Sequence, residues 1–404
     1  MVYSRFAGRN DSNQHGRATM FSSRIEWGSG KNRLSALLDA KRGAGEEPLD
    51  LTVSNPTAVG FDYDTGHILR TLAAPETLAY HPSPQGSEAA RQAVAGYYHD
   101  HGKKVSVESL FLTASTSEAY DQVLKLLCDP GDELLVPRPS YPLFEYLAAL
   151  ASVKIRPYPL VHDGKTGWRV DLDALAAAVG PRCRAIAVVN PNNPTGSFVT
   201  REELGFMNQL CRDADLALLV DEVFLDYPAP GVAWLSAAGN GGALTFTLSG
   251  LSKIQGLPQL KLGWIQVSGP RAEEARERLE LVADTYLSVS APAQAAAALL
   301  ATRQGFQRQL LDRLESNETF LRRAVEEVPA AAVLRRSGGW CAIVSVESWS
   351  SDEKLALTLL DKDGVLVHPG FYYDIELENP CLVCSLITPP KVFRAGVERL
   401  LARL

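Results

Sequence analysis

The sequence predicts an α/β protein with a large domain, in which helices sandwich a mostly parallel sheet, and a smaller α+β domain. Between residues 110 and 269, short apolar runs alternate with stretches of helical periodicity. From about residue 270 this alternation gives way to long helices rich in Ala, Leu and Arg. The length of 404 residues exceeds the size at which one hydrophobic core keeps growing, so two domains are expected.

The strands of the large domain are expected where short, mostly apolar runs lie between turn residues. These runs cover 110–115, 133–138, 153–160, 185–190, 216–224, 243–249 and 262–269. Helical periodicity falls between several of them, at 117–128, 143–151, 171–179 and 201–214. Parallel neighbours need a crossover connection, so this alternation predicts a mostly parallel sheet with helices on both faces.

The smaller domain is expected at the C-terminal end. Helices are predicted around 271–287, 316–328 and 390–404, and strands at 340–346 and 381–387. Residues before about 60 have no strand series of their own and are expected to pack with this domain. The chain therefore divides into an N-terminal segment (1–60), a large domain (61–285) and a small domain (286–404).

Composition and charge favour a soluble globular protein. Hydrophobic residues make up 46% of the chain and charged residues 22%, which is ordinary for folded proteins. The net charge of −7 argues against nucleic acid or an anionic membrane as a partner. No run of eighteen uncharged apolar residues is present, so no membrane helix is expected.

The six cysteines lie mostly in apolar stretches, which favours a reducing compartment over a disulfide framework. Cys381 and Cys384 lie in a strand-like run, CLVCSLI, and no metal site is expected there. The first twenty residues are polar and lack the apolar region of a secretion signal, so a cytoplasmic protein is expected. Residues 1–19 are interpreted as an extension or a misassigned start.

The sharpest local signal is NPNNPTG at 190–196, directly after the apolar run AIAVV. A helix is expected to follow, because Thr200 and Glu203 have the spacing of a capping box. The segment predicts a tight turn that carries Asn193 at the carboxyl end of a strand. Taken alone, the Asn and Pro residues would indicate only a turn that connects a strand to a helix.

Asp221 and Glu222 end the apolar run LALLVDEVF, at the strand end where open α/β sheets bind ligands. A carboxylate buried there needs a cation or a hydrogen-bond donor, and a protonated heterocyclic nitrogen would serve. A solvent-exposed acidic pair is the alternative interpretation.

Lys253 follows a Ser- and Gly-rich turn in SGLSKIQG, after the run ALTFTL. A lysine that is partly desolvated in such a turn loses its proton readily, which a Schiff-base nucleophile requires. Without the other two segments, Lys253 would be interpreted as a solvated surface residue.

Together, in this order and spacing, the three segments resemble the fold-type-I pyridoxal-phosphate enzymes, specifically the class I/II aminotransferases. The resemblance runs from about residue 25 to the C-terminus. It implies an aspartate-aminotransferase-like fold, with pyridoxal 5'-phosphate as cofactor in the large domain. It further implies that Lys253 forms a Schiff base with the cofactor, that Asp221 keeps the pyridine nitrogen protonated and that Asn193 bonds the phenolic oxygen.

These roles agree with elementary chemistry. A protonated pyridine ring accepts the electrons left when a bond at the substrate Cα breaks. The Lys253 amine, once released from the cofactor, can move the Cα proton as a general base. The expected reaction moves an amino group between an amino acid or amine and a 2-oxo acid.

A phosphate site is expected where a strand, a Ser/Thr-rich turn and a helix start follow one another, because a helix N-terminus binds anions. The expected donors are Ser115, Thr116 and Ser117 at this start, Ser249 and Ser252 beside the lysine turn, and Lys261, which by the resemblance replaces a phosphate-binding Arg. A helix N-cap role for the first three is compatible with this.

Two tyrosines take their roles from the resemblance. Tyr141 would stack on the pyridine face, although a core tyrosine is the alternative. Tyr80, in AYHPSPQG, matches a segment that in the family reaches the phosphate of the neighbouring subunit, with one extra residue between Tyr and Gly. A homodimer with a shared active site is therefore expected.

The sequence departs from the family pattern at two positions. Phe224 stands where many relatives have a tyrosine that donates to the ring oxygen, and Tyr227 is a nearby candidate to compensate. Val383 stands where the family has an Arg that clamps the substrate carboxylate. The candidates to replace that Arg are Arg335, Arg336 and Asn55, or an Arg elsewhere in the chain. If none does, either the substrate is an amine without a free carboxylate, or backbone and Asn groups bind the carboxylate.

Aminotransferase is therefore the predicted activity, and two alternatives stay open. The same Lys253 chemistry supports a lyase, a decarboxylase or a racemase, because the bond that breaks depends on pocket geometry. A non-catalytic pyridoxal-phosphate-binding regulator is the alternative from another class. A nucleotide-binding enzyme is disfavoured, since GSGKNR at 28–33 lacks the pattern of a P-loop.

Overall fold

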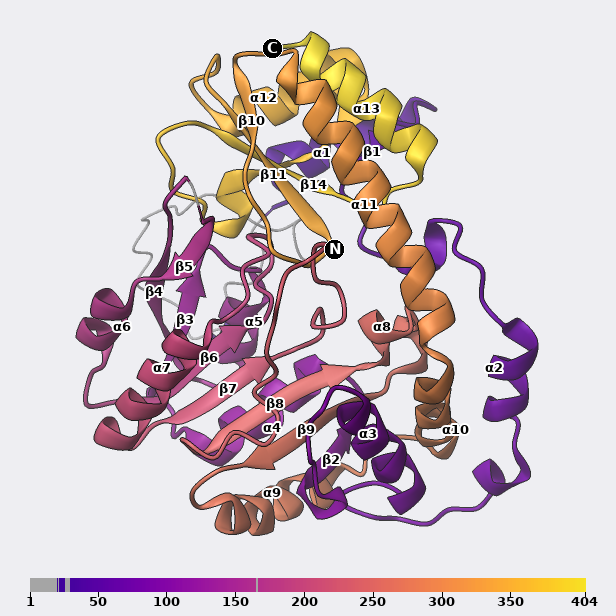
Figure 1. Ribbon diagram of the computed structural model, residues 1–404, viewed down its shortest axis with the longest axis vertical. Helices are drawn as coiled ribbons and strands as arrows, with labels where there is room; N and C mark the ends of the chain where they lie inside the picture. The colour runs from indigo at the N-terminus through magenta and orange to yellow at the C-terminus, as the bar shows by residue number, and fades with distance from the viewer. Residues whose placement is uncertain (1–19, 21, 26–29, 165) are drawn as a thin grey trace.

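The computed structural model describes residues 20, 22–25, 30–164 and 166–404 and is built on an eight-stranded sheet with helices on both faces (Figure 1). The strand order is β2-β9-β8-β7-β6-β3-β4-β5. The strands are β2 (Leu110–Thr113), β3 (Glu133–Arg138), β4 (Lys154–His162), β5 (Trp168–Val170), β6 (Cys183–Val189), β7 (Ala217–Asp221), β8 (Thr245–Gly250) and β9 (Gly263–Ser268). All seven expected strands are present, and the α/β prediction is confirmed.

The centre of this sheet is parallel. Strands β4, β3, β6, β7 and β8 run in one direction, whereas β9 and the two edge strands, β2 and β5, pair antiparallel with their neighbours. Strand β5 was not expected, because three residues are too few for alternation to show. The parallel order brings the carboxyl ends of β6 and β7 to the same edge, where ligands bind in open α/β sheets.

Side chains that alternate along each strand pack against different helices. Leu218 and Val220 of β7 belong to the core cluster that includes Met207 of α7 (Arg201–Ala214). Leu219 belongs to the cluster beneath α4 (Thr116–Leu127), α5 (Leu143–Leu150) and α9 (Ala272–Tyr286). With α6 (Leu172–Ala178), these helices confirm the periodicity found in the sequence. The continuous apolar strand sequences follow from burial on both faces.

A smaller antiparallel sheet, in the order β10-β11-β14-β13, lies above the large one in Figure 1. Its strands are β10 (Ala331–Val333), β11 (Cys341–Val346), β13 (His368–Pro369) and β14 (Cys381–Ser385). The accompanying helices are α11 (Gln304–Glu326), α12 (Asp352–Thr358) and α13 (Pro390–Ala402). The predicted α+β character of the C-terminal part is confirmed.

The described residues of the N-terminal segment that form α1 and β1 join this smaller part of the molecule. Strand β1 (Leu49–Asp50) pairs in parallel with β12 (Val365–Leu366), and α1 (Arg33–Gly43) contacts α12. The remaining helices are α2 (Thr65–Leu72), α3 (Glu88–Asp100), α8 (Leu251–Ile254) and α10 (Ala291–Ala295). The division of the chain at residues 60 and 285 remains our proposal.

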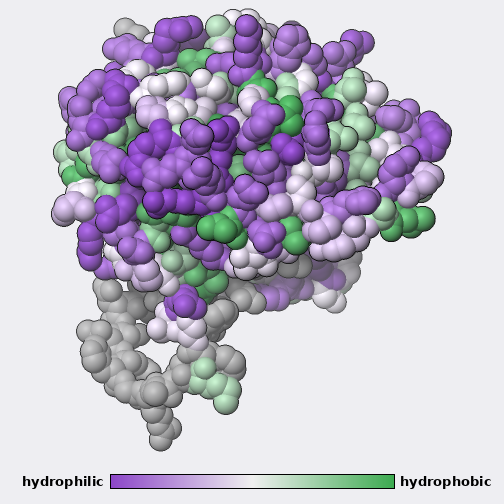
Figure 2. Space-filling model, turned by 90° about the horizontal axis from the view of Figure 1, so that it is seen from below, coloured by the Kyte–Doolittle hydropathy of each residue, from purple (hydrophilic) through white to green (hydrophobic). Residues whose placement is uncertain are grey.

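The surface shown in Figure 2 is mostly hydrophilic, with hydrophobic side chains scattered over it. Within the described residues, no helix combines the length and apolar character that crossing a bilayer requires.

Candidate active site

A cavity of about 280 Å³ lies where the carboxyl ends of the large sheet meet the smaller sheet. Six of the residues predicted for the site line it, and so do Phe224 and Val383. The six are Thr116, Ser117, Tyr141, Asn193, Asp221 and Lys253. Because they come from five separate segments of the chain, the cavity brings together chemistry that the sequence showed only as isolated motifs.

Asp221 is the last residue of β7, and its side chain is held in place by two donors. The Tyr120 hydroxyl donates to Oδ2 at 3.1 Å, and the backbone N–H of Val223 donates to Oδ1 at 3.1 Å. Burial raises the pKa of Asp221 from its ordinary value of 3.8 to about 6, although the two hydrogen bonds and the charge of Lys253 each lower it. The carboxylate is thus poorly solvated and suited to a cationic partner.

Lys253 lies in the short helix α8, directly after β8. Its Nζ is 4.9 Å from the centre of the Trp340 ring and 5.5 Å from that of Phe224. Burial lowers the pKa of Lys253 from 10.5 to about 8, although the Asp221 charge opposes this. Lys253 therefore releases its proton more readily than a solvated lysine, and the neutral amine is the nucleophilic form.

The turn at 190–196 holds Asn193 at the cavity through bonds made by its neighbours. The Asn190 amide donates to the Leu235 carbonyl at 2.8 Å, and that of Asn192 donates to the Pro139 carbonyl at 3.0 Å. The capping box of Thr200 and Glu203 starts α7 as predicted. Asn193 itself accepts a weak bond from the Cys341 thiol, at 3.6 Å from Sγ to Oδ1. The side chains around Asn193 thus fix the backbone and leave Asn193 facing the cavity.

The start of α4 supplies the next part of the wall. The Ser115 hydroxyl caps the helix by accepting from the Glu118 N–H at 3.2 Å, so the N-cap interpretation holds. Thr116, Ser117 and Tyr120 line the cavity. Tyr120 is not among the residues that the motifs predict, although it follows Thr116 and Ser117 by four and three residues, the spacing of one helix face.

Phe224 lines the cavity, but Tyr227 does not compensate for the missing hydroxyl. The Tyr227 side chain is fully buried and donates to the backbone carbonyl of Lys253 at 2.5 Å. It therefore supports the lysine turn from behind and does not face the cavity.

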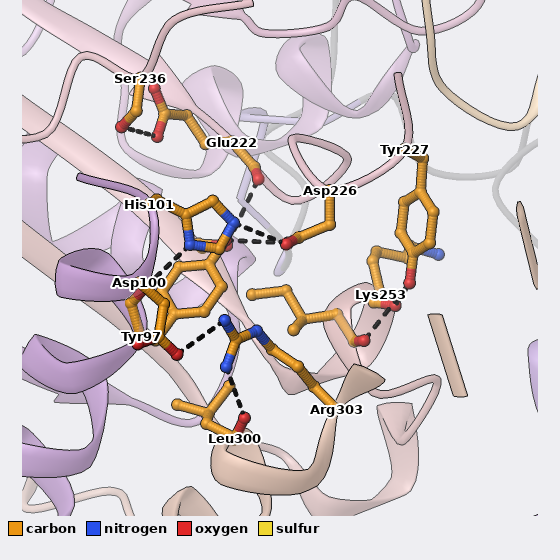
Figure 3. A network of polar contacts seen from close by, with 12 residues as sticks. Tyr97, Asp100, His101, Glu222, Asp226, Tyr227, Ser236, Lys253, Leu300 and Arg303 are labelled. Carbon is orange, nitrogen blue, oxygen red and sulfur yellow. Dashed lines mark hydrogen bonds and ion pairs between the residues drawn. The ribbon is translucent and has the colours of Figure 1, made fainter. Parts of the chain in front are cut away.

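A buried polar network lies behind this turn (Figure 3). Asp226 accepts from the Tyr97 hydroxyl at 2.8 Å and contacts His101 Nε2 at 2.9 Å. In the same region, Glu222 accepts from the Ser236 hydroxyl at 2.7 Å and from the Ala237 N–H. The segment between Asp221 and Tyr227 is thus anchored on the side away from the cavity.

The other predicted residues do not line the cavity. Ser249 is buried, and its hydroxyl lies 3.4 Å from the Glu222 carbonyl. Ser252 is half-buried and Lys261 exposed, and Ser115 acts as the cap. Tyr80 is 78% exposed and lies in a separate surface groove with Gln294. Phosphate binding by these residues stays a prediction.

The smaller sheet and the residues beside it contribute a wall that no motif in the sequence predicts, apart from the position of Val383. It consists of Trp340, Cys341, His368, Tyr373, Val383 and Ser385. No local motif marks these residues, because tertiary packing brings them together; for Cys341, His368, Val383 and Ser385 this packing is the register of the strands.

The three named candidates to replace the carboxylate-binding Arg do not line the cavity. Arg336 is buried, pairs with Glu318 at 2.5 Å and donates to the Gly339 carbonyl. Asn55 accepts from the N–H and hydroxyl of Thr57. Arg335 is also absent from the lining. Among the described residues that line the cavity, Lys253 is the only Lys or Arg.

Comparison with known proteins places this arrangement in one family. Residues 49–403 match the family "Aminotransferase class I and II". The chain is 31% identical over 374 residues to an alanine aminotransferase of Mycobacterium tuberculosis, covering 88% of this chain and 85% of that protein.

Two solved structures share the fold. An aminotransferase from Escherichia coli superposes with a TM-score of 0.83 at 25% identity, covering 96% of this chain and 98% of that one. A mutant aspartate aminotransferase of Thermus thermophilus gives 0.82 at 21% identity, covering 95% and 99%. The expected aspartate-aminotransferase-like fold is confirmed. This chain belongs to the class I and II aminotransferases, a family that uses pyridoxal phosphate to transfer amino groups between amino acids and 2-oxo acids.

Proposed function

We propose that Lys253 binds pyridoxal 5'-phosphate as a Schiff base and that amino transfer takes place in the cavity around it. The observation that carries this proposal is that Lys253 and Asp221 line one cavity, and that burial shifts both pKa values toward neutrality. When bound, the cofactor supplies an electron sink for the bond that breaks at the substrate Cα.

The described residues fit this cofactor. Asp221 would hold the proton on the pyridine nitrogen, since a buried carboxylate with a raised pKa gains most from a cationic partner. Tyr120 would keep the carboxylate oriented through its 3.1 Å hydrogen bond. Asn193 would bond the phenolic oxygen, and the Tyr141 ring would stack on the pyridine face, as both line the cavity.

The phosphate would lie at the N-terminus of α4. The first N–H groups of a helix have no acceptor within the helix, and Thr116 and Ser117 add hydroxyls at the cavity. Strand β9 approaches this turn closely, since a Cβ at Gly263 would lie 3.0 Å from the Ser115 carbonyl carbon. We propose that Ser249, Ser252 and Lys261 support this site from outside the cavity lining.

Lys253 would also move the substrate proton. With a pKa of about 8, its Nζ can accept the proton from Cα near neutral pH and return it elsewhere. Trp340 and Phe224 pack around the amine and limit the water that reaches it. The substrates proposed are an amino acid and a 2-oxo acid, with alanine the first amino donor to test because the similar mycobacterial protein is an alanine aminotransferase.

We further propose a homodimer in the cytoplasm. The exposure of Tyr80 (78%) and Leu78 (91%) suits contact with a second subunit, and all six cysteines are free, as a reducing compartment would require. Light scattering after size exclusion tests the homodimer: a mass near 88 kDa, twice that of the chain, supports it, and a monomeric mass rejects it.

Borohydride reduction tests the central proposal. After reduction of the holoprotein, peptide mapping should find the pyridoxyl group on Lys253, and Lys253→Ala should abolish the label while Lys125→Ala, a surface control, should keep it. In holoprotein that has not been reduced, alanine should convert the cofactor absorbance to that of the pyridoxamine form, and a 2-oxo acid should restore it. A label on another lysine, or ammonia release without restoration, would reject the proposal.

A further inference from the structure

Cys341, the first residue of β11, brings a thiol from the smaller sheet to a residue proposed to hold the cofactor. It lines the cavity together with Asn193 and Lys253. Its Sγ lies 3.6 Å from Oδ1 of Asn193, within reach of the weak hydrogen bond that a thiol donates. Among the described residues, this is the one hydrogen bond that the Asn193 side chain makes. The contact therefore joins the two sheets at the cavity.

Cys341 is held at this distance by backbone pairing on both sides of it. Shortly before it, the N–H of Ser337 donates to the carbonyl of Gly196 at 3.1 Å. Gly196 ends the turn 190–196 that carries Asn193, so the loop before β11 is bonded directly to this turn. From Cys341 onward, β11 pairs with β14 in the antiparallel sheet. Main-chain hydrogen bonds thus place the thiol against the Asn193 amide.

A donor at Oδ1 determines which way the Asn193 amide is turned, because the group carries an acceptor oxygen on one side and a donor nitrogen on the other. Burial raises the pKa of Cys341 to about 12, although the charges of Arg336 and Lys253 lower it. The thiol therefore keeps its proton near neutral pH and can donate it to Oδ1. With Oδ1 turned to the thiol, Nδ2 is left to face the cavity.

We propose that Cys341 is a positioning residue, whose thiol turns the Asn193 amide so that Nδ2 donates to the phenolic oxygen of the cofactor. This inference rests on the proposed function of the Lys253 cavity. In the opposite orientation, Oδ1 would face the phenolic oxygen and repel its negative charge. Because Phe224 has no hydroxyl to offer this oxygen, its deprotonated form depends more strongly on Asn193.

The pH dependence of the cofactor absorbance tests this inference, because a donor at the phenolic oxygen favours the deprotonated form. Wild-type holoprotein and its variants are titrated in a spectrophotometer without substrate. Cys341→Ala and Cys341→Val remove the thiol donor, and the second keeps its bulk, whereas Cys341→Ser keeps a donor. Cys384→Ala is the matched control, since this thiol is buried in the neighbouring strand β14 and does not line the cavity.

Asn193→Ala should raise the pH of half-titration by about 1–2 units, the size of a hydrogen bond to a charged oxygen. Cys341→Ala and Cys341→Val should raise it by about 0.3–1 unit, because part of the free energy of that bond is then spent on orienting the amide. Cys341→Ser should lie closer to wild type, and Cys384→Ala should shift the titration by less than about 0.1 unit. In the Asn193→Ala background, Cys341→Ala should add less than about 0.1 unit.

Titrations of Cys341→Ala and Cys341→Val that match wild type would overturn the inference, and Cys341→Val decides if Cys341→Ala does not fold. So would an Asn193→Ala variant that titrates like wild type. A shift from Cys341→Ala that is equally large in the Asn193→Ala background would also overturn it, because the thiol would then act by another route. If the wild-type protein binds no cofactor at Lys253, the proposed function itself fails, and this outcome is distinct from a failure of Cys341 alone.

Discussion

Replacing Asp221 with Asn should stabilise the cofactor-free protein while it weakens amino transfer. Burial raises the pKa of the Asp221 carboxyl from 3.8 to about 6, so the ionised form is held in the folded protein at a free-energy cost. We expect Asp221→Asn to raise the free energy of unfolding by about 1–3 kcal/mol at pH 7.5. The upper figure converts the whole pKa difference at about 1.4 kcal/mol per pH unit, and the lower figure allows for solvent in the cavity.

The sign of the pH dependence follows from the two pKa values. Between about pH 4 and pH 6, the folded protein holds a proton that the unfolded chain has released, so the free energy of unfolding falls as pH rises. Above about pH 6 the loss of stability caused by the ionised Asp221 carboxylate no longer changes with pH. The gain from Asp221→Asn should therefore be absent near pH 4 and complete above about pH 6.5.

Urea unfolding of the two cofactor-free proteins between pH 4 and 8, followed by circular dichroism, measures this gain. Glu222→Gln is a matched control, because burial raises the pKa of Glu222 to about 7 but the residue does not line the cavity. Both variants should be stabilised at pH 7.5, whereas only Asp221→Asn should slow amino transfer, by about 100-fold or more. A stability of Asp221→Asn equal to wild type at pH 7.5, or a gain that persists at pH 4, would refute the reasoning.

Three further predictions concern the same region. Because the pKa of Lys253 is about 8, the rate at which the cofactor-free protein captures pyridoxal phosphate should rise with pH and level off above about pH 8.5. Stopped-flow absorbance measures this rate, and a rate that does not rise with pH would contradict the prediction. Phe224→Tyr should lower the pH at which the cofactor absorbance of the holoprotein titrates, since the new hydroxyl favours the deprotonated form; an unchanged titration would count against the assigned position of Phe224. Burial alone would lower the pKa of His101, but the bond to Asp226 raises it, so the stabilisation of the folded protein by this pair is complete below about pH 6 and is lost as pH rises through the raised pKa. In urea unfolding, His101→Leu should lower the free energy of unfolding by about 3 kcal/mol at pH 6 and by less at pH 9. An equal loss at both pH values would contradict the pairing.

The sequence was sufficient for the elements whose signals are local. The seven runs of the large sheet and the capping box at Thr200 depend on residues close to each other in the chain, and the structure has them within a few residues of the expected bounds. The same holds for Asp221, whose place at a strand end follows from the apolar run before it. These features depend on periodicity and turn chemistry, which are properties of short segments.

The wall formed by the smaller sheet could not be predicted in this way. His368 lies in a two-residue strand and meets Val383 only through the register of β13 on β14. Tyr227 was also open to two interpretations, because its distance along the chain from Phe224 does not show whether it faces the cavity or the backbone of Lys253. Register and side-chain direction depend on tertiary packing, which one sequence does not display.

The two sheets supply different residues to the cavity, and this difference affects which substitutions the enzyme can tolerate. Asp221 ends a strand of the large sheet and Lys253 directly follows another; Tyr120 and Tyr227 hold these two residues in place, so a substitution there disturbs chemistry and folding at once. The facing positions 368, 373 and 383 belong to a separately formed layer. Directed evolution toward new amines should therefore accumulate tolerated changes in that layer first, with the catalytic half left intact.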